Sequence, residues 1–240
     1  MIYHRVLSRP VGPIKMSLLL ALQRVTQQVQ EAAPGRAVTI LAVSKGQSAA
    51  AIRTLAQAGQ RDFGENYLQE ALEKQLALAD LTLQWHFIGP LQSNKTKSVA
   101  LHFNWVHSVD RLKIAERLSQ ARMEAGLPPL NICLQVNISG EVSKSGLVPQ
   151  EVGEVAQAVR ALQGVRLRGL MAIPEPSADL EAQRKPFAAL RHLQDTLNAG
   201  GTGLDTLSMG MSQDFAAALQ EGSTIVRMGT AIFGARERAI

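Results

Sequence analysis

Apolar residues fall in two alternating patterns along the chain. Short clusters rich in β-branched and aromatic residues recur eight times, and an amphipathic segment of helical period separates each cluster from the next. The clusters predict strands over 39–45, 61–66, 83–88, 105–108, 131–138, 165–173, 204–209 and 224–228. The intervening pattern predicts helices over 17–33 (before the first strand), 48–58, 67–79, 94–102, 110–125, 149–162, 178–198 and 214–220.

This alternation predicts an α/β fold with parallel strands. Parallel neighbours need right-handed crossovers through a helix, and eight such units in about 200 residues favour a single (β/α)8 TIM barrel with an additional N-terminal helix. An open, doubly wound sheet of six or seven strands is the alternative, because periodicity does not reveal closure. No G-x-G-x-x-G follows the first predicted strand, which disfavours a dinucleotide-binding fold. Ser48 and Asp110 are the expected N-caps of the helices that they precede.

Composition supports one large domain. The chain has 240 residues, of which 46% are hydrophobic, enough for a sizeable core. Residues 1–16 contain two prolines and no helical period, so we expect a disordered extension, or an over-called start with Met16 as the initiator. Residues 17–240 form the expected barrel. The apolar run 18–22 is too short for a signal peptide or a membrane span, so we expect a cytoplasmic protein with no membrane partner.

Charge, aromatic content, cysteine content and histidine spacing disfavour nucleic-acid and metal binding and indicate a reducing compartment. The net charge is +5, but Arg5, Arg9 and Lys15 supply three of these charges, and the remainder carries +2. Aromatic residues make up 4%, so no stacking platform accompanies a basic patch, and nucleic acid is not an expected partner. The single cysteine, Cys133, lies in an apolar run and is expected in the core of a protein from a reducing compartment. No histidine pair has metal-ligand spacing on a helix, so no metal site is expected.

Polar residues gather where the predicted strands end. Lys45 ends the first strand just before Gly46, where partial burial would lower its pKa and make its amine nucleophilic. Most lysines at a strand end, however, simply extend into solvent. Asn66, His86, His107, Asn137, Ser208 and Arg227 lie at or near the ends of later strands. In a barrel these ends meet on one face, which carries the functional site. His86 taken alone is typical of a half-buried histidine with satisfied hydrogen bonds.

The last two loops predict a phosphate site. Barrels commonly bind phosphate after strands seven and eight, and here the segments 207–212 and 227–230 offer hydroxyls and glycine-flanked amides. A phosphate site beside a nucleophilic lysine indicates a ligand with both a phosphate and a carbonyl. Pyridoxal 5′-phosphate (PLP) and a phosphosugar aldehyde both qualify. Arg227 helps to choose between these two ligands. An arginine beside a pyridine nitrogen cannot accept a proton, so it would hold the PLP ring neutral and make that ring a weak electron sink.

The same residues resemble a known family. The strings AVSK (42–45), FGENYLQE (63–70), WHFIGPLQSNK (85–95), VHSVD (106–110), QVNISGEVSKSGL (135–147), GLMAI (169–173), LSMGMSQD (207–214) and RMGTAIFGAR (227–236) are similar to those of the pyridoxal phosphate homeostasis proteins. The resemblance implies a barrel like the N-terminal domain of alanine racemase, known as fold type III. It also implies roles for seven residues: Lys45 as the aldimine lysine, Asn66 near the ring, Arg227 facing the pyridine nitrogen, and Ser208, Gly229 and Thr230 at the phosphate, with Ser212 as a further candidate.

The resemblance also implies what the protein does. The family is regarded as carriers or regulators in intracellular PLP (vitamin B6) homeostasis, with PLP-dependent apoenzymes as candidate recipients and no established catalysis. Racemases of this fold use a second base, a tyrosine on a C-terminal β domain, but this chain ends shortly after its eighth predicted strand. Its tyrosines are Tyr3 and Tyr67. We therefore expect a monomeric PLP-binding protein without catalytic residues. A slow PLP-dependent racemase and a Schiff-base phosphosugar enzyme are the alternatives.

Overall fold

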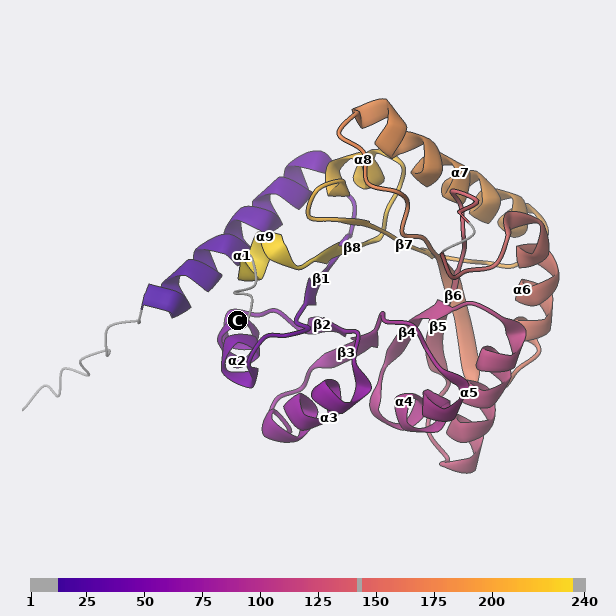
Figure 1. Ribbon diagram of the computed structural model, residues 1–240, viewed down its shortest axis with the longest axis horizontal. Coiled ribbons are helices and arrows are strands. Elements are labelled where there is room, and N and C mark those ends of the chain that lie inside the picture. Colours follow the sequence, from indigo (N-terminus) through magenta and orange to yellow (C-terminus); the bar gives the residue numbers. More distant parts are fainter. Residues whose placement is uncertain (1–12, 142–143, 235–240) are drawn as a thin grey trace, which may run out of the picture.

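Eight parallel strands form a closed barrel in the structure, a computed structural model that describes residues 13–141 and 144–234 (Figure 1). The strands are β1 (Thr39–Val43), β2 (Asp62–Glu65), β3 (Gln84–Phe87), β4 (Trp105–Val109), β5 (Leu130–Gln135), β6 (Val165–Met171), β7 (Thr206–Met211) and β8 (Ile225–Met228). Each strand pairs with the next along the chain, and β8 pairs with β1 to close the ring. The predicted (β/α)8 barrel is confirmed, and the open sheet is wrong.

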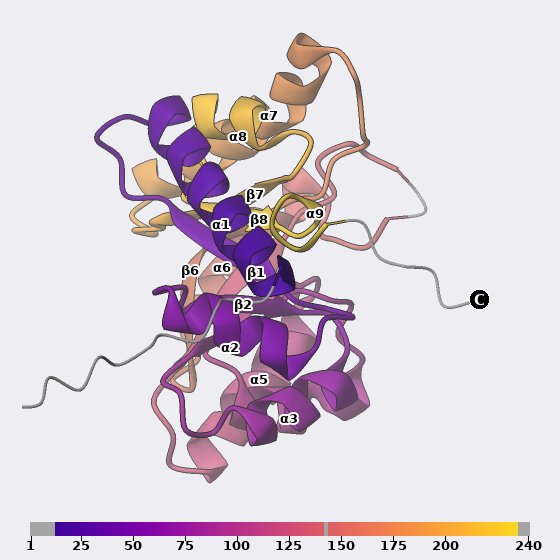
Figure 2. The same ribbon diagram turned by 90° about the vertical axis from the view of Figure 1, so that its left-hand side faces the viewer.

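Helices cover the outside of this barrel (Figure 1). They are α1 (Pro13–Ala32), α2 (Ala49–Gln57), α3 (Leu68–Ala77), α4 (Thr96–His102), α5 (Leu112–Glu124), α6 (Val152–Arg160), α7 (Leu180–Ala199), α8 (Phe215–Gln220) and α9 (Thr230–Phe233), with 3-10 turns η1 (Ser93–Lys95) and η2 (Pro149–Glu151). Every predicted helix is present, with ends shifted by a few residues. Figure 2 shows α9 and the long loops after β5 and β6 at the same end of the barrel.

The N-terminal helix completes the outer ring. The helix after β8, α9, is a single turn, and α1 packs against α2, α8 and α9. Its predicted apolar stripe, Leu18, Leu22, Val25 and Val29, is buried. The helix begins at Pro13, earlier than predicted from Ser17, because the fixed φ of proline suits the first helical position. Residues 1–12 of the predicted extension lie outside the described residues.

One of the two predicted N-caps is wrong. The Ser48 side chain accepts a hydrogen bond from the Ala51 amide at the start of α2, as predicted. At α5, however, Arg111 occupies the N-cap position, and the Asp110 carboxylate instead accepts a hydrogen bond from the Arg111 guanidinium, at 2.8 Å. The extended backbone of Arg111, with φ −166°, places Asp110 one residue too early to cap the helix.

The core confirms the expectation for the cysteine. Cys133, on β5, is completely buried, and burial raises the pKa of its thiol to about 12. In the described part of the chain, no helix is long and apolar enough to cross a membrane. The same residues contain no cluster of three or more histidine, cysteine, aspartate or glutamate side chains that could hold a metal ion.

Candidate functional site

A cavity of about 290 Å³ opens at the carboxyl ends of the strands. This volume is at the lower end of the range of about 300–1,000 Å³ that is typical of small-molecule sites. Six of the seven residues predicted for the cofactor line it: Lys45, Asn66, Ser212, Arg227, Gly229 and Thr230. The seventh, Ser208, does not. Of the lysines that the structure describes, only Lys45 lines the cavity, so Lys95 and Lys144 lie outside it.

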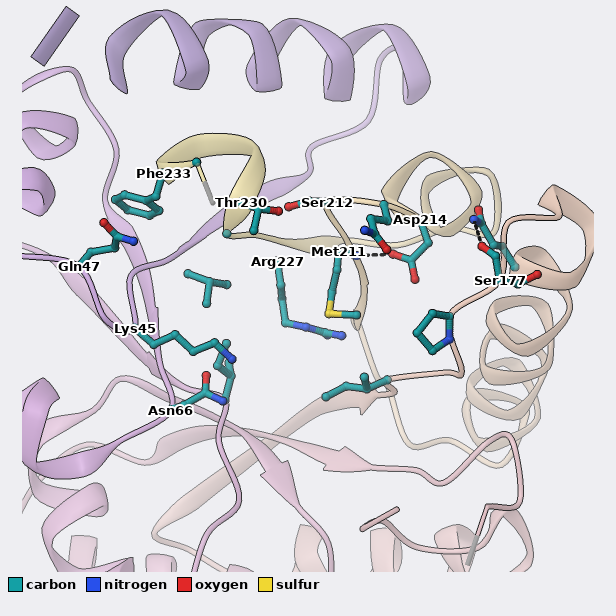
Figure 3. Close-up of a pocket in the computed structure, with 18 residues that line it drawn as sticks. Lys45, Gln47, Asn66, Ser177, Met211, Ser212, Asp214, Arg227, Thr230 and Phe233 are labelled. Carbon is teal, nitrogen blue, oxygen red and sulfur yellow. Dashed lines mark hydrogen bonds between the residues drawn. The ribbon is translucent and has the colours of Figure 1, made fainter. Parts of the chain in front are cut away.

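Lys45 follows β1 and extends into the cavity beside Asn66 (Figure 3). Side chains alternate between the two faces of a strand, so Ser44 points outward from the barrel and Lys45 inward. The strand ladder continues past β1, because the Ser44 amide donates to the Gly64 carbonyl at 2.9 Å. Gly46 then turns the chain with φ +73°, a conformation that residues with a side chain rarely adopt. The lysine is therefore presented from a rigid strand end.

A buried ionic cluster holds the backbone on both sides of Lys45. Behind the strand, the Lys74 ammonium donates to the Ser44 carbonyl at 2.7 Å and to the Glu65 carboxylate at 2.8 Å. The Ser44 hydroxyl donates to the same Glu65 oxygen, at 2.6 Å. Glu70 accepts from both Lys74 and the Gly46 amide. Burial raises the pKa of the Glu65 carboxyl group, while the hydrogen bonds from Lys74 and Ser44 oppose the shift.

Asn66 is fixed by a close backbone contact. A Cβ added to Gly89 would lie 2.3 Å from the Asn66 carbonyl oxygen, so only glycine permits this approach between the loops after β2 and β3. The Asn66 Oδ1 atom is buried and accepts no hydrogen bond from any described residue. Buried polar atoms are normally satisfied. A ligand donor in the cavity would complete this one.

Arg227 is held rigidly in the wall of the cavity. One terminal nitrogen donates to the carbonyl and the hydroxyl of Ser208, at 2.6 and 2.9 Å, and the other donates to the Ala172 carbonyl at 2.9 Å. The side chain is buried, and desolvation lowers its pKa to about 10. Because that value is well above 7, the guanidinium stays charged at neutral pH and can only donate hydrogen bonds.

Ser208 and Ser212, both predicted at the phosphate, lie in different environments. Ser208 is fully buried within β7, and its hydroxyl faces Arg227 and His107 instead of the cavity. Ser212, just after β7, lines the cavity, and its hydroxyl accepts a hydrogen bond from the Ala231 amide in α9 at 3.2 Å. In Figure 3 the Ser212 and Thr230 hydroxyls face each other at the top of the cavity. Of these two serines, Ser212 lines the cavity and Ser208 does not.

Sequence reasoning missed the depth at which two histidines lie. His86 on β3 and His107 on β4 are 1% and 0% exposed, and one ring nitrogen of each is 2.9 Å from the other. The prediction of a half-buried His86 with satisfied hydrogen bonds is right about the bonds and wrong about the depth. The signal was present in the period-two alternation, which places both rings on the inner face of their strands.

Comparison with known proteins agrees with this geometry. The family model described as alanine racemase, N-terminal domain, matches residues 19–237. A pyridoxal phosphate homeostasis protein of Pseudomonas aeruginosa is 62% identical over 221 residues, which cover 90% of this chain and 94% of that protein. The chain belongs to the pyridoxal phosphate homeostasis protein family. The family member of Escherichia coli K12 is 51% identical over 203 residues, 83% of this chain and 86% of that protein.

Solved structures extend the comparison. PipY of Synechococcus elongatus, in a structure with PLP bound, has a TM-score of 0.82 at 38% identity, covering 90% of this chain and all of that one. An alanine racemase of Clostridium difficile has a TM-score of 0.73 at 15% identity, covering 93% of this chain and 58% of that one. The second likeness concerns the fold alone. Together they confirm the expected family and the alanine racemase-like barrel.

Proposed function

We propose that this chain binds PLP in the cavity, attaches it covalently to Lys45 and holds it as a carrier or regulator in vitamin B6 homeostasis. The observation that carries the proposal is the arrangement of the Lys45 amine, the Arg227 guanidinium and the Ser212 and Thr230 hydroxyls around a single cavity (Figure 3). PLP, when bound, supplies an aldehyde whose carbon condenses with the lysine amine as water leaves. Its three polar regions, the aldehyde, the ring nitrogen and the phosphate, match these groups.

Each side chain has a distinct part in the proposal. Lys45 is the attachment point, and the unsatisfied Asn66 Oδ1 accepts a hydrogen bond from the ligand. Ser212, Gly229 and Thr230 bind the phosphate, where small residues leave room for its oxygens. Arg227 faces the ring nitrogen. As a donor only, it keeps that nitrogen unprotonated, which suits retention of the cofactor better than carbanion chemistry.

The lining of the cavity also supports a carrier over a racemase. A two-base racemase needs a second proton-transferring group opposite the lysine. Among the described residues no tyrosine lines the cavity, and Tyr67 is 59% exposed. The carboxylate in the lining, Asp214, already accepts a hydrogen bond from the Met211 amide. The proposed recipients of the cofactor are PLP-dependent apoenzymes, with the cytoplasm as the proposed location.

A spectroscopic titration tests the proposal. Wild-type protein titrated with PLP is expected to develop the near-visible absorbance of a lysine-linked cofactor, and Lys45→Ala is expected to lose it. Lys95→Ala is the matched control, because that lysine also follows a strand on this face but does not line the cavity. Equal absorbance in wild type and Lys45→Ala would refute the attachment point. Transfer of PLP from the purified complex to an apoenzyme, faster than from Lys45→Ala mixed with PLP, would support the carrier role.

A further inference from the structure

A chain of hydrogen bonds crosses the barrel interior from Arg227 to the opposite end. Its links join neighbouring side chains on β8, β7, β4, β3 and β2, which surround the barrel centre in Figure 1. The distances are 2.9 Å from Arg227 to Ser208 Oγ, 2.7 Å from Ser208 Oγ to His107 Nδ1, 2.9 Å from His107 Nε2 to His86 Nδ1, and 3.1 Å from His86 Nε2 to Asp62 Oδ1. Every member except Asp62 is buried.

The chemistry of the two ends fixes the direction of the chain. Arg227 can only donate, so the Ser208 oxygen accepts from it and its own proton is available to the next acceptor, His107 Nδ1. A neutral His107 then carries its proton on Nε2 and donates it to His86 Nδ1. His86 in turn carries its proton on Nε2 and donates to the Asp62 carboxylate. Every link is satisfied, and all protons point the same way.

The opposite direction is unfavourable at both ends. It would place an unprotonated His86 nitrogen against the Asp62 carboxylate, two acceptors with no proton between them, unless His86 were charged. Burial lowers the pKa of His86, and burial together with His86 and Arg227 lowers the pKa of His107 well below its ordinary range. The His86 ring is also clamped, because it stacks on Trp105 with an interplanar angle of 6°. Neither ring can flip without losing these contacts.

We propose that His107 and His86 are positioning residues that orient the Ser208 hydroxyl and thereby hold Arg227 in place for the cofactor ring. This inference rests on the proposed function for the role of Arg227. His107 Nδ1 draws the Ser208 proton away from the guanidinium, so that the serine lone pairs face Arg227. Without that acceptor the hydroxyl can turn its proton toward Arg227, and a donor then meets a donor. Ser208 thus serves the cofactor through Arg227 and not through the phosphate.

The direction of the chain is testable without any cofactor. Long-range 1H–15N NMR spectra of the imidazole nitrogens distinguish the two neutral tautomers. In the apo protein at pH 7 we expect His86 and His107 to be neutral Nε2–H tautomers, with Nδ1 unprotonated in both. His102, exposed on α4, is the internal reference for a solvent-accessible ring. A dominant Nδ1–H tautomer or a charged imidazolium at His107 would overturn the proposal.

Substitutions test the link to the cofactor. His107→Leu removes the acceptor, whereas His107→Asn keeps one near the position of Nδ1. We expect PLP to bind His107→Leu about tenfold more weakly, equivalent to about 1.4 kcal/mol, with a shifted absorbance maximum, and His107→Asn to restore most of both. His102→Leu is the matched control and should bind like wild type. Circular dichroism and urea unfolding establish that each variant is folded.

The outcomes separate this inference from the proposed function. If wild type binds PLP and a folded His107→Leu binds it with unchanged affinity and spectrum, the positioning role is refuted and the proposed function stands. Equal weakening in His107→Leu and His107→Asn would also refute it, because loss of packing alone would then explain the effect. If wild type does not bind PLP, the proposed function fails. The role assigned to the hydrogen-bond chain then fails too, whichever tautomers the two histidines adopt.

Discussion

Replacing Lys74 by methionine tests the buried cluster behind Lys45. The change keeps the length of the side chain and removes the charge that pairs with Glu65. Lys74 is 6% exposed and Glu65 is 0% exposed, so water cannot replace the lost ammonium. The second carboxylate oxygen of Glu65, Oε2, already has no hydrogen-bond partner among the described residues. Lys74→Met therefore leaves a buried charge with the Ser44 hydroxyl as its remaining donor.

The expected loss of stability is large. Removing one partner of a buried ion pair costs about 3–5 kcal/mol in the free energy of unfolding. For a chain of this size, about 1 kcal/mol changes the melting temperature by about 2–4 °C, so we expect Tm to fall by about 6–20 °C. Urea unfolding at pH 7 measures the loss. Lys97→Met, an exposed lysine on α4, is the matched control and should change stability by about 0.5 kcal/mol or less.

The loss should depend on pH with a definite sign. Burial holds the pKa of Glu65 above its ordinary value, and removing Lys74 raises it further. The folded variant then binds a proton that the unfolded chain has released, so its stability falls as pH rises above the ordinary glutamate pKa of about 4.3. We expect the difference from wild type to be greatest near pH 8 and smallest near pH 5. Adding Glu65→Gln to Lys74→Met should recover part of the loss.

Two results would refute this reasoning. A loss below about 1 kcal/mol at pH 7 would place the pair among exposed salt bridges, which contribute little. A loss that is equal at pH 5 and pH 8 would exclude the buried Glu65 charge as its cause. Because the cluster also holds the Ser44 carbonyl and the Gly46 amide, Lys74→Met should in addition reduce the amount of PLP attached to Lys45.

Three further predictions concern the cavity and the core. Thr230→Phe should raise the dissociation constant for PLP while leaving the melting temperature within a few degrees of wild type, because the larger side chain crowds the phosphate without cutting into the core. An unchanged dissociation constant would refute the phosphate role of Thr230. Loss of folding would indicate that Thr230 has a structural role instead. The PLP complex given L-alanine in deuterated water should exchange the α-proton no faster than PLP alone at equal concentration, and fast exchange abolished by Lys45→Ala would make the protein an enzyme. Cys133 should resist alkylation at pH 8 in the native state and react in urea, since burial raises its pKa to about 12; rapid native alkylation would contradict that burial.

The order of elements and the face that carries the site follow from sequence patterns. Each strand has an apolar cluster and each helix an amphipathic stripe, and parallel βα units place strand ends on one face. The pattern of residues alone therefore assigns Lys45, Arg227 and Thr230 to a common site. The same pattern places Asn66 on this face, and the resemblance of the motifs added its expected role near the ring; Asn66 lies in the same cavity.

The sequence patterns did not show which of these side chains face the cavity and which are buried in the barrel. The sequence pattern ends the seventh strand at Met209, one residue after Ser208, so Ser208 is expected at the mouth of the barrel, whereas β7 continues to Met211. Ser208 consequently points into the barrel and Ser212 reaches the cavity. Extending the strand by two residues keeps both serines on the same face but moves Ser208 deeper into the barrel and brings Ser212 to its mouth. The alternation along β3 and β4 places His86 and His107 on the inner face, but it does not show that the two rings pair. The Glu65–Lys74 and His86–His107 contacts join separate elements, and which residues meet across elements leaves no periodic signal.

The most direct test of the account is to locate the covalent attachment of PLP. Wild-type protein is mixed with PLP, reduced with borohydride, digested and mapped by mass spectrometry. We predict that the reduced adduct lies on Lys45, the described lysine that lines the cavity, and that Lys45→Ala yields no dominant adduct in the folded state. An adduct found mainly on Lys95 or Lys144 of the native protein would contradict it.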